Sequence, residues 1–474
     1  MSDSSLALTR ILNLLDESSF VEIGAGITDR ATDFNQKPKE EKSDGVVTGY
    51  GLIEGSPVYV FSQNPAVLGG SVGEMHARKI AALYKLAMKT GAPVIGLLDS
   101  TGMRLAEGTD ALMALGKLAK TMTKASGIIP QIMGVFGEIG GGLAVLTGLA
   151  DFVFQEEKAR LFVNAPDAIK GNSKEKCDNG AVKFQSQETP NVDFAGSAEE
   201  VYAGIRSLAA MLPSNNEDNG KIFEGEDDPN RLIPEITGAM TDPAVMFAQI
   251  ADDAEFFELK ADYAKHMVTG FIKLNAQLVG VFGNRSEVFD ENGEKTESFE
   301  EKLYPKGVTK AVDLIRFCDA FEIPILSVVN LNGFRGCLCG EKSHIEKTAA
   351  LLAAYAAASV PKVSLVTGKA ISAAALAMGT KATGADLALA WEGAKIGPME
   401  PEMAAKVLFD GKSAAELEEA ALQYEAGVVN ASNAARRGFI DLMIKPEETR
   451  KQLSYAFEML YSKVEHPDKK HGTK

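Results

Sequence analysis

Three short segments rich in small residues could do chemistry through their main chain. The first, Leu68–Met75 (LGGSVGEM), has three glycines within five positions before a predicted helix, and the second is Gly137–Leu143 (GEIGGGL). The third, Gly368–Ala374 (GKAISAA), has small residues where the second has glycines. Glycine lets a ligand approach the backbone closely, and free N–H groups at a helix start attract negative charge. Each segment therefore predicts a place where N–H groups could hold negative charge, and the second an arrangement that could stabilise a developing oxyanion.

Each segment also has a purely structural interpretation, as a tight turn or as close packing of a helix on a strand. Side-chain catalysis offers no stronger candidate, because the chain has no GxSxG elbow, Walker loop, HExxH or CxxC motif. His76 and His344 stand near glycine turns, but a histidine in such a place is more often structural. Chemistry that relies on backbone N–H groups needs none of these motifs.

The composition limits the classes of ligand. The 474 residues are 45% hydrophobic and 24% charged, which is typical of a globular protein with two or three domains. With 65 acidic against 49 basic residues, the formal net charge of -16 argues against binding to nucleic acid. An anionic ligand then needs a local basic patch or main-chain N–H groups.

Four cysteines are too few for a disulfide framework in a chain this long, so reduced thiols and a cytoplasmic location are expected. Cys337 and Cys339 could bind a soft metal or change redox state, but no second Cys/His pair completes a metal site, and none is predicted. The opening residues 1–20 lack the basic start and apolar run of a signal peptide.

An internal repeat sets the organisation of the chain. Val47-Thr48-Gly49 recurs 221 residues later as Val268-Thr269-Gly270. Apolar runs that begin at Pro93 and Pro130 recur 231 residues later, at Pro324 and Pro361. Each half alternates apolar strands, glycine-rich turns and helices, which predicts an α/β fold of two similar domains.

The clearest predicted helices are Met75–Lys89 and Glu346–Ala358, which we assign to equivalent places in the two halves. The acidic segment Ser214–Arg231 predicts an exposed linker, and Pro467–Lys474 a frayed tail. We therefore expect domains at residues 1–235 and 236–474.

Taken together, these segments closely resemble the carboxyltransferase subunits of biotin-dependent acyl-CoA carboxylases and decarboxylases. In the first half the resemblance runs through Val46–Gln63, Leu68–Ile80, Leu86–Gly108 and Ile129–Gly142. In the second half it runs through Asp227–Glu235, Phe317–Ile325, Ser359–Ala370 and Ala434–Leu453. It implies two tandem crotonase-like domains, each a β-superhelical sheet with surrounding helices, of which the first binds CoA and the second biotin.

The resemblance also implies roles for individual residues. Gly141 and Gly142 would hold the thioester enolate, and Ala373 and Ala374 the ureido oxygen of biotin, while the cofactor itself serves as the base. The remaining binding positions are Gly69, Gly70, Gly73, Gly102 and Gly140 on the CoA side, and Gly333, Phe334, Ala370 and Ser372 on the biotin side. A valine in place of Gly141 should block the oxyanion pocket.

This chain departs from the family pattern in the second half. Ser372-Ala373 stands where the family has Gly-Gly, and the predicted loop Arg335–His344 lacks the usual Leu-Pro-Gly. The tripeptide Ala87-Met88-Lys89 mimics a biotinylation motif but falls inside a predicted helix. Biotin is therefore expected on a separate carrier protein, with a biotin carboxylase or a membrane decarboxylase subunit as a further partner and a homohexamer as the assembly.

Two other functions stay open at this stage. A biotin-independent crotonase-type hydratase or hydrolase would need a pair of carboxylates aimed at the thioester. A non-catalytic assembly paralogue would keep CoA binding but lose carboxyl exchange. The acyl group, of acetyl, propionyl, malonyl or methylmalonyl type, and the direction of transfer cannot be read from the sequence.

Overall fold

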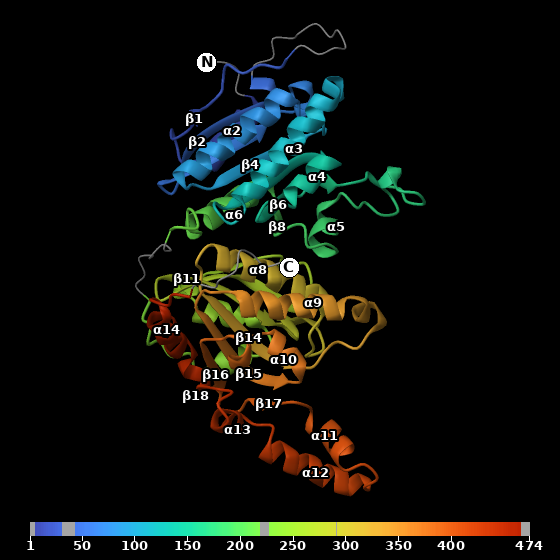
Figure 1. Cartoon of the computed structure of the whole chain (residues 1–474), viewed down its shortest axis with the longest axis vertical. Coiled ribbons are helices and arrows are strands. Elements are labelled where there is room, and N and C mark those ends of the chain that lie inside the picture. Colours follow the sequence, from blue (N-terminus) through green and yellow to red (C-terminus); the bar gives the residue numbers. More distant parts are fainter. Residues whose placement is uncertain (1–4, 31–42, 219–226, 291, 466–474) are drawn as a thin grey trace. The chain divides into compact units, whose positions relative to one another are not determined.

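The chain folds as two compact units, Met1–Asn219 and Gly220–Lys474, in a computed structural model (Figure 1). The structure describes residues 5–30, 43–218, 227–290 and 292–465. Most of the predicted linker's centre, residues 219–226, and the predicted tail, residues 467–474, lie outside the described residues. The boundary between the two units, after Asn219, lies earlier in the chain than the predicted boundary after residue 235.

The first unit is built on a mixed sheet with eight strands among its described residues. Strands β1, β2 and β3 pair antiparallel, and β3, β4, β5, β6 and β8 then follow in parallel order, with β7 on the end of β5. The strands are β1 (Val21–Glu22), β2 (Val46–Ile53), β3 (Ser56–Gln63), β4 (Val94–Ser100), β5 (Gln131–Gly140), β6 (Phe152–Glu156), β7 (Arg160–Phe162) and β8 (Phe194–Gly196). The helices are α1 (Leu6–Leu14), α2 (Glu74–Thr90), α3 (Gly108–Ala125), α4 (Gly142–Thr147), α5 (Val182–Gln187) and α6 (Ala198–Met211).

The second unit repeats this topology strand for strand, with β9, β10, β11, β14, β15, β16 and β18 in order and β17 on the end of β15. Its strands are β9 (Phe256–Glu258), β10 (Met267–Leu274), β11 (Gln277–Asn284), β14 (Ile325–Asn332), β15 (Lys362–Ile371), β16 (Leu387–Trp391), β17 (Lys395–Gly397) and β18 (Leu442–Ile444), besides the hairpin β12 (Glu287–Phe289) and β13 (Lys295–Ser298). Its helices are α7 (Pro243–Ile250), α8 (Pro305–Ala320), α9 (Leu338–Ala357), α10 (Ala373–Ala377), α11 (Pro401–Leu408), α12 (Ala414–Gly427), α13 (Ala431–Arg436) and α14 (Thr449–Leu460). The prediction of an α/β fold made of two similar halves is confirmed.

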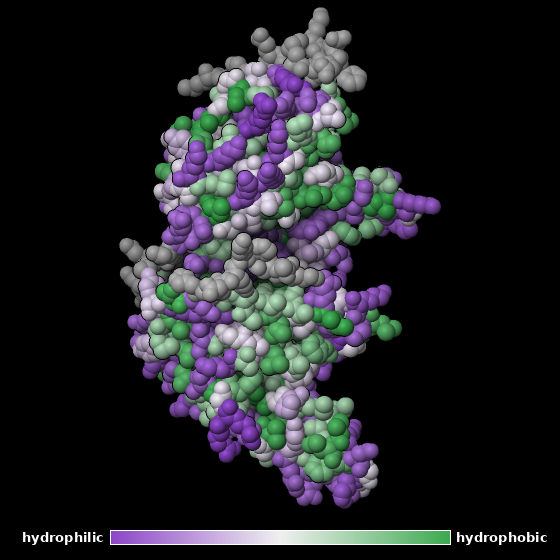
Figure 2. Space-filling model, viewed as in Figure 1, coloured by the Kyte–Doolittle hydropathy of each residue, from purple (hydrophilic) through white to green (hydrophobic). Residues whose placement is uncertain are grey.

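A helical hairpin of α11 and α12 extends from the sheet of the second unit (Figure 1). It exposes several large apolar side chains, among them Val407 (66% exposed), Leu408 (59%) and Leu422 (64%). Apolar surface gathers over this hairpin in Figure 2. Large apolar groups concentrated on one projecting element are typical of an interface.

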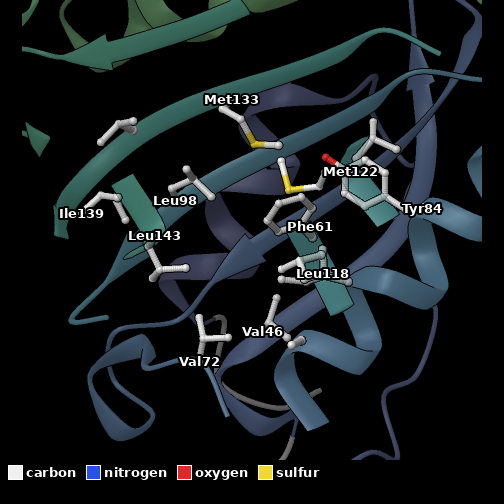
Figure 3. Close-up of a cluster of buried hydrophobic side chains, with 14 of the residues drawn as sticks. Val46, Phe61, Val72, Tyr84, Leu98, Leu118, Met122, Met133, Ile139 and Leu143 are labelled. Atoms are coloured by element: carbon white, nitrogen blue, oxygen red, sulfur yellow. The ribbon is translucent and has the colours of Figure 1, made fainter. Parts of the chain in front are cut away.

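Apolar side chains of two helices pack against a face of each sheet and bury it. In the first unit, α2 and α3 place Tyr84, Leu118 and Met122 against Phe61 and Met133 of the sheet (Figure 3). Burial of each large side chain contributes roughly 1.5 to 3 kcal/mol. In the second unit, helices α7 and α14 cover one sheet face in the same way. The turns between strands and helices are thus held on a rigid framework.

The predicted pairing of helices between the halves is wrong. Helix α2 lies between β3 and β4, and its counterpart is α8, between β11 and β14. The predicted helix Glu346–Ala358 belongs to α9, which follows β14 and corresponds to α3 instead. Helix propensity alone favoured α9 as the counterpart of α2, because the alanines of α9 are stronger helix formers than the valines and phenylalanine of α8.

The predicted loop Arg335–His344 is also mostly wrong, because α9 already begins at Leu338. Cys337 starts the helix early, since its sulfur accepts the N–H of Gly340. In the first unit, β5 continues through Gly137 to Gly140, because residues 138–140 pair with β7. The turns at Gly141 and at Ser372 therefore follow β5 and β15 directly.

A packing arrangement that occurs in both units explains why Gly137 and Gly368 are glycines. A Cβ atom on Gly137 would lie 2.0 Å from Oδ1 of Asp99, and one on Gly368 would lie 2.3 Å from Oδ1 of Asn330. The N–H of Asp99 donates to Gln63, just as that of Asn330 donates to Asn284. In each unit, then, a polar side chain near the carboxyl end of β4 or β14 occupies the space where the Cβ atom of the glycine would lie.

Replacing Gly137 by alanine should lower the free energy of unfolding by about 1 to 3 kcal/mol, because the new methyl group would overlap the Asp99 carboxylate. Chemical denaturation measures the effect. The matched control is Gly116→Ala in the exposed part of α3, where a Cβ would meet no atom within 4 Å. That change should stabilise the protein by up to about 1 kcal/mol, since alanine is the better helix former. Equal effects of the two substitutions would contradict the packing account.

Candidate active site

The glycine segments of the first unit meet at the carboxyl ends of β4 and β5. Ser100 pairs with Ile139 across these strands, and a short parallel bridge joins Val72 to Met103. The bridge holds the LGGSVGEM segment against the loop that follows β4. Ligands of parallel sheets bind at this edge, outside the carboxyl ends of the strands.

The turn between β5 and α4 leaves one exposed N–H group free. Gly141 has φ 61° and ψ -131°, a conformation that favours glycine, and its N–H donates to the carbonyl of Phe162 at 3.1 Å. Gly142 is the first residue of α4, so its N–H has no partner within the helix, and it meets no acceptor among the described residues. Of the two predicted donors, Gly142 is the one available to a ligand.

Two of the predicted CoA-side glycines face open space. A Cβ atom on Gly102 or Gly141 would meet nothing within 4 Å. Both residues have positive φ angles, 107° and 61°. A ligand could therefore approach the main chain closely at Gly141, which is partly exposed, whereas Gly102 is itself buried beside a space that could admit a larger group.

The other CoA-side glycines are required by packing within the chain. A Cβ atom would lie 2.9 Å from the side chain of Thr101 if added to Gly69, 2.3 Å from the carbonyl of Asp99 if added to Gly70, and 2.9 Å from the ring of Phe162 if added to Gly140. On Gly73 it would meet Glu107 at 2.3 Å. For these four, a structural role accounts for the glycine without a ligand.

A buried charge cluster fixes the loop after β4. The Arg104 guanidinium pairs with Asp44 and with Glu107, the latter at 2.9 Å, and donates to the carbonyl of Ser71 at 2.7 Å. Burial raises the pKa of the Asp44 carboxyl, although Arg104 opposes the rise. Since Gly102 and Met103 directly precede Arg104, the cluster holds them in place. Met103 was not among the predicted donors, yet its N–H has no acceptor among the described residues and follows Gly102 directly.

The equivalent turn of the second unit repeats this geometry with a serine. Ser372 has φ 74° and ψ 179°, and its N–H donates to the carbonyl of Gly397 at 3.0 Å. Its hydroxyl oxygen accepts the N–H of Ala374 at 3.2 Å. Ala373 opens α10, is exposed, and its N–H meets no acceptor in the described part of the chain. Ala373 is thus the counterpart of Gly142, whereas the predicted donor Ala374 is already bonded.

One of the remaining biotin-side candidates, Gly333, lies beside this turn. A Cβ on Gly333, which has φ 82°, would lie 3.5 Å from the Ser372 hydroxyl. Phe334 is 40% exposed. Ala370, in contrast, is buried in β15 opposite Leu331, where it packs within the sheet. The structure therefore brings Gly333 and Ser372 together and sets Ala370 in the core.

The histidines near the turns are buried in this structure. His76 is 0% exposed and bonds the Asp44 carbonyl at 3.0 Å and the Gln63 amide at 3.3 Å. Burial lowers the pKa of His76 to about 3, and the positive charge of Arg104 adds to the shift. His344 is buried in α9, with Nε2 against the Arg335 carbonyl at 2.9 Å. The structure thus gives His76 a structural role.

A paired-carboxylate site does not form at the first turn among the residues that the structure describes. The side chain of Glu107 is buried and committed to Arg104 and to the N–H of Glu74. Glu138 points outward, with its side chain 69% exposed, and lies 3.4 Å from Arg160. The two carboxylates therefore have other partners, and the available groups at the turn are main-chain N–H groups.

His76 should make the fold sensitive to acid. Its pKa is about 3 when folded and 6.5 when unfolded, so the unfolded chain binds one more proton between these values and stability falls as the pH drops below about 6.5. In His76→Gln the slope of unfolding free energy against pH between pH 6 and 4 should decrease by about 1.4 kcal/mol per pH unit. Denaturant titrations at several pH values measure this slope. Identical slopes in the two proteins would show that His76 does not resist protonation.

Comparison with known proteins covers almost the entire chain. The carboxyl transferase domain family matches residues 2–473. The propionyl-CoA carboxylase beta chain of Roseobacter denitrificans is 36% identical, over 98% of this chain and 92% of that protein. The methylmalonyl-CoA decarboxylase subunit alpha of Veillonella parvula is 36% identical over the same shares.

A solved structure has the same fold. The transcarboxylase 12S structure, described as a hexamer with methylmalonyl-coenzyme A and methylmalonic acid bound, superposes with a TM-score of 0.91 at 33% identity and covers 98% of this chain and 92% of its own. Within the described ranges, no helix has both the length and the apolar character needed to cross a bilayer.

Proposed function

Because this chain belongs to the carboxyl transferase family, with two crotonase-like domains and acyl-CoA carboxyltransferase activity, we propose that it moves a carboxyl group between biotin on a separate carrier protein and the α-carbon of a short acyl-CoA. The observation that carries this proposal is the duplicated free N–H group, on Gly142 in the first unit and Ala373 in the second. Each is the exposed first residue of a short helix at the carboxyl end of a central strand.

The first unit provides the acyl-CoA side. The N–H of Gly142 is placed to donate to the thioester oxygen, with Met103 as a second donor directly after Gly102. Negative charge grows on this oxygen when the α-proton leaves, so the donors bind the enolate more tightly than the thioester. Each donor contributes about 3 kcal/mol of transition-state stabilisation. Gly141 lets the thioester approach the backbone.

The second unit provides the biotin side. A ureido oxygen fits a site with one free N–H group, that of Ala373, at a turn that the positive-φ residue Gly333 approaches. The partly exposed Phe334 follows Gly333 in the chain. When bound, biotin supplies the carboxyl group and the base. Ser372 keeps the N–H of Ala374 bonded, which leaves this side with fewer free donors than the sequence predicts.

The similar proteins support a class of substrate, but they do not fix the direction in which the carboxyl group is transferred. The names of the similar proteins refer to propionyl-CoA and methylmalonyl-CoA, a pair related by one carboxyl group. We therefore infer short substrates of the propionyl, methylmalonyl, acetyl or malonyl type. Either a biotin carboxylase or a membrane decarboxylase subunit would complete the reaction, and a cytoplasmic location suits both.

The biotin-independent hydratase finds no support in the geometry. Such an enzyme needs two carboxylates aimed at the thioester, and Glu107 and Glu138 have other partners. The non-catalytic alternative rests on Ser372, yet the free N–H of Ala373 persists beside it. We therefore retain the carboxyltransferase as the proposed function.

We further propose that the chain assembles with copies of itself, as a hexamer in which the first domain of one copy faces the second domain of another. The transcarboxylase neighbour is described as a hexamer. The apolar hairpin α11–α12 is a surface that a second copy would cover.

The decisive test of the site removes a single N–H group. Proline at Gly142 deletes the donor, and the first position of a helix accepts proline. We expect the transfer rate from malonyl- or methylmalonyl-CoA to biotin to fall roughly 100- to 1000-fold. The control, Gly142→Ala, keeps the N–H and adds a methyl group 3.3 Å from Leu115, so it should retain most activity.

Equal losses in the two variants would contradict the N–H mechanism, provided that circular dichroism shows both to be folded. A valine at Gly141 would be less informative. It would combine a blocked pocket with the strain of a positive φ angle, and the two effects could not be separated.

Assembly should depend on the helical hairpin. The double substitution Val407→Asp and Leu408→Asp places two charges on its apolar surface, and burial of unpaired charges is costly. Native mass spectrometry should therefore show smaller oligomers than the wild-type protein forms. The matched control is Val464→Asp, at an exposed residue outside the hairpin, which should leave the mass of the assembly unchanged. A wild-type monomer would refute the assembly proposal.

A further inference from the structure

Two cysteines lie together at the start of the longest helix of the second unit. Cys337 is the N-cap of α9, and its sulfur accepts the N–H of Gly340 at 3.2 Å. The sulfur of Cys339, in the first turn of the helix, lies 3.0 Å from that of Cys337. Cys339 is exposed and Cys337 partly so, and neither is in a disulfide.

The surroundings of Cys337 favour its thiolate. The hydrogen bond from Cys339 and the bond from Gly340 N–H lower the pKa of the Cys337 thiol, and the positive charge of Arg335 adds to the effect. The amino end of a long helix also stabilises a negative charge. A thiolate with a second thiol in contact is the arrangement found in redox-active cysteine pairs.

The pair is linked to the biotin side of the site through short contacts. His344, further along α9, contacts the Arg335 carbonyl at 2.9 Å and packs edge-on against the ring of Phe334, with 5.7 Å between ring centres. Gly333 lies beside the hydroxyl of Ser372. A conformational change at the start of α9 would therefore be transmitted through these contacts to the residues proposed to surround biotin.

We propose that Cys337 and Cys339 form a reversible thiol–disulfide site that switches the biotin side of the second unit. Its effect on transfer rests on the proposed function, whereas the thiol chemistry does not. In the reduced form, the Cys337 sulfur caps α9 and the loop that contains Phe334 is held. In the oxidised form, the Cys337 sulfur is bonded to that of Cys339. It then carries no negative charge and is a poor N-cap for the helix.

The oxidation balances with a peroxide as the oxidant. The Cys337 thiolate attacks one oxygen of hydrogen peroxide, the O–O bond breaks, and hydroxide leaves with the electron pair, so that Cys337 becomes a sulfenic acid. The thiol of Cys339 then loses its proton, its sulfur attacks that of Cys337, and water leaves. A dithiol reductant such as dithiothreitol reverses the disulfide by thiol exchange.

A metal site is the weaker interpretation of the same pair. No group of three or more His, Cys, Asp and Glu side chains is placed to hold a metal ion in the ranges that the structure describes. His344, which lies near Gly340 as Cys337 does, uses Nε2 to contact the Arg335 carbonyl. Redox chemistry requires only the two sulfurs.

The experiment treats the reduced full-length protein with low hydrogen peroxide and maps the cysteines by mass spectrometry. We expect the peptide that contains Cys337 and Cys339 to lose two hydrogen atoms and to regain them with dithiothreitol. In Cys339→Ser, Cys337 should accumulate as a sulfenic acid that dimedone traps. Cys177, the other exposed thiol, provides an internal control and should react more slowly.

The second readout is the carboxyl transfer rate of the same samples. Peroxide should lower the wild-type rate reversibly and leave Cys337→Ser unaffected, because serine is itself a good N-cap and keeps α9 capped. No disulfide, or oxidation of Cys337 no faster than that of Cys177, would overturn the proposal. A disulfide that leaves the transfer rate unchanged would overturn the switch.

The two readouts also separate this inference from the proposed function. If the reduced wild-type protein transfers no carboxyl group, the proposed function fails, and the mass measurements still decide whether the thiol pair is redox active. Hydrogen exchange at the start of α9 then replaces the rate as the test of the switch. Faster exchange in the oxidised protein supports it, and unchanged exchange overturns it.

Discussion

The candidate site depends on one hydrogen bond that occurs in each unit. The residue after the central strand, Gly141 or Ser372, adopts a positive φ angle and donates its N–H to a neighbouring strand, at Phe162 or Gly397. This bond ends the strand and turns the chain into a short helix. The next N–H, on Gly142 or Ala373, is therefore left outside both the sheet and the helix. A polar group that is exposed and unpaired at a fixed position can stabilise charge without reorganisation.

The second unit keeps this geometry at a higher conformational cost. A serine at φ 74° is strained by roughly 1 to 3 kcal/mol relative to a relaxed conformation. Part of that cost is offset by the bond from Ala374 N–H to the serine hydroxyl. The underlying support is duplicated as well, since the packing of Asn330 over Gly368 repeats that of Asp99 over Gly137. The two units thus share a framework, and they differ in that the second has the Ser372 side chain at the turn where the first has Gly141.

Sequence reasoning found the repeat, the fold class and the strand-to-helix turns, because these leave regular signals in apolar runs and in glycine spacing. It assigned Gly141 and Ala374 as donors, whereas their N–H groups are bonded to Phe162 and to Ser372. Those partners come from a different strand and from a side-chain rotamer, neither of which a local pattern contains. The 231-residue offset, which aligns Gly142 with Ala373, was a signal that could have identified the equivalent pair. The helix pairing failed because alanine-rich composition reports helix propensity and not position in the topology.

The central claim is that unbonded main-chain N–H groups polarise the thioester. Infrared difference spectroscopy of a ¹³C-labelled acyl-CoA thioester bound to the protein measures this polarisation directly. The account predicts that the carbonyl stretch of the bound thioester lies at lower frequency than in water. A bound carbonyl at the same or a higher frequency would contradict it.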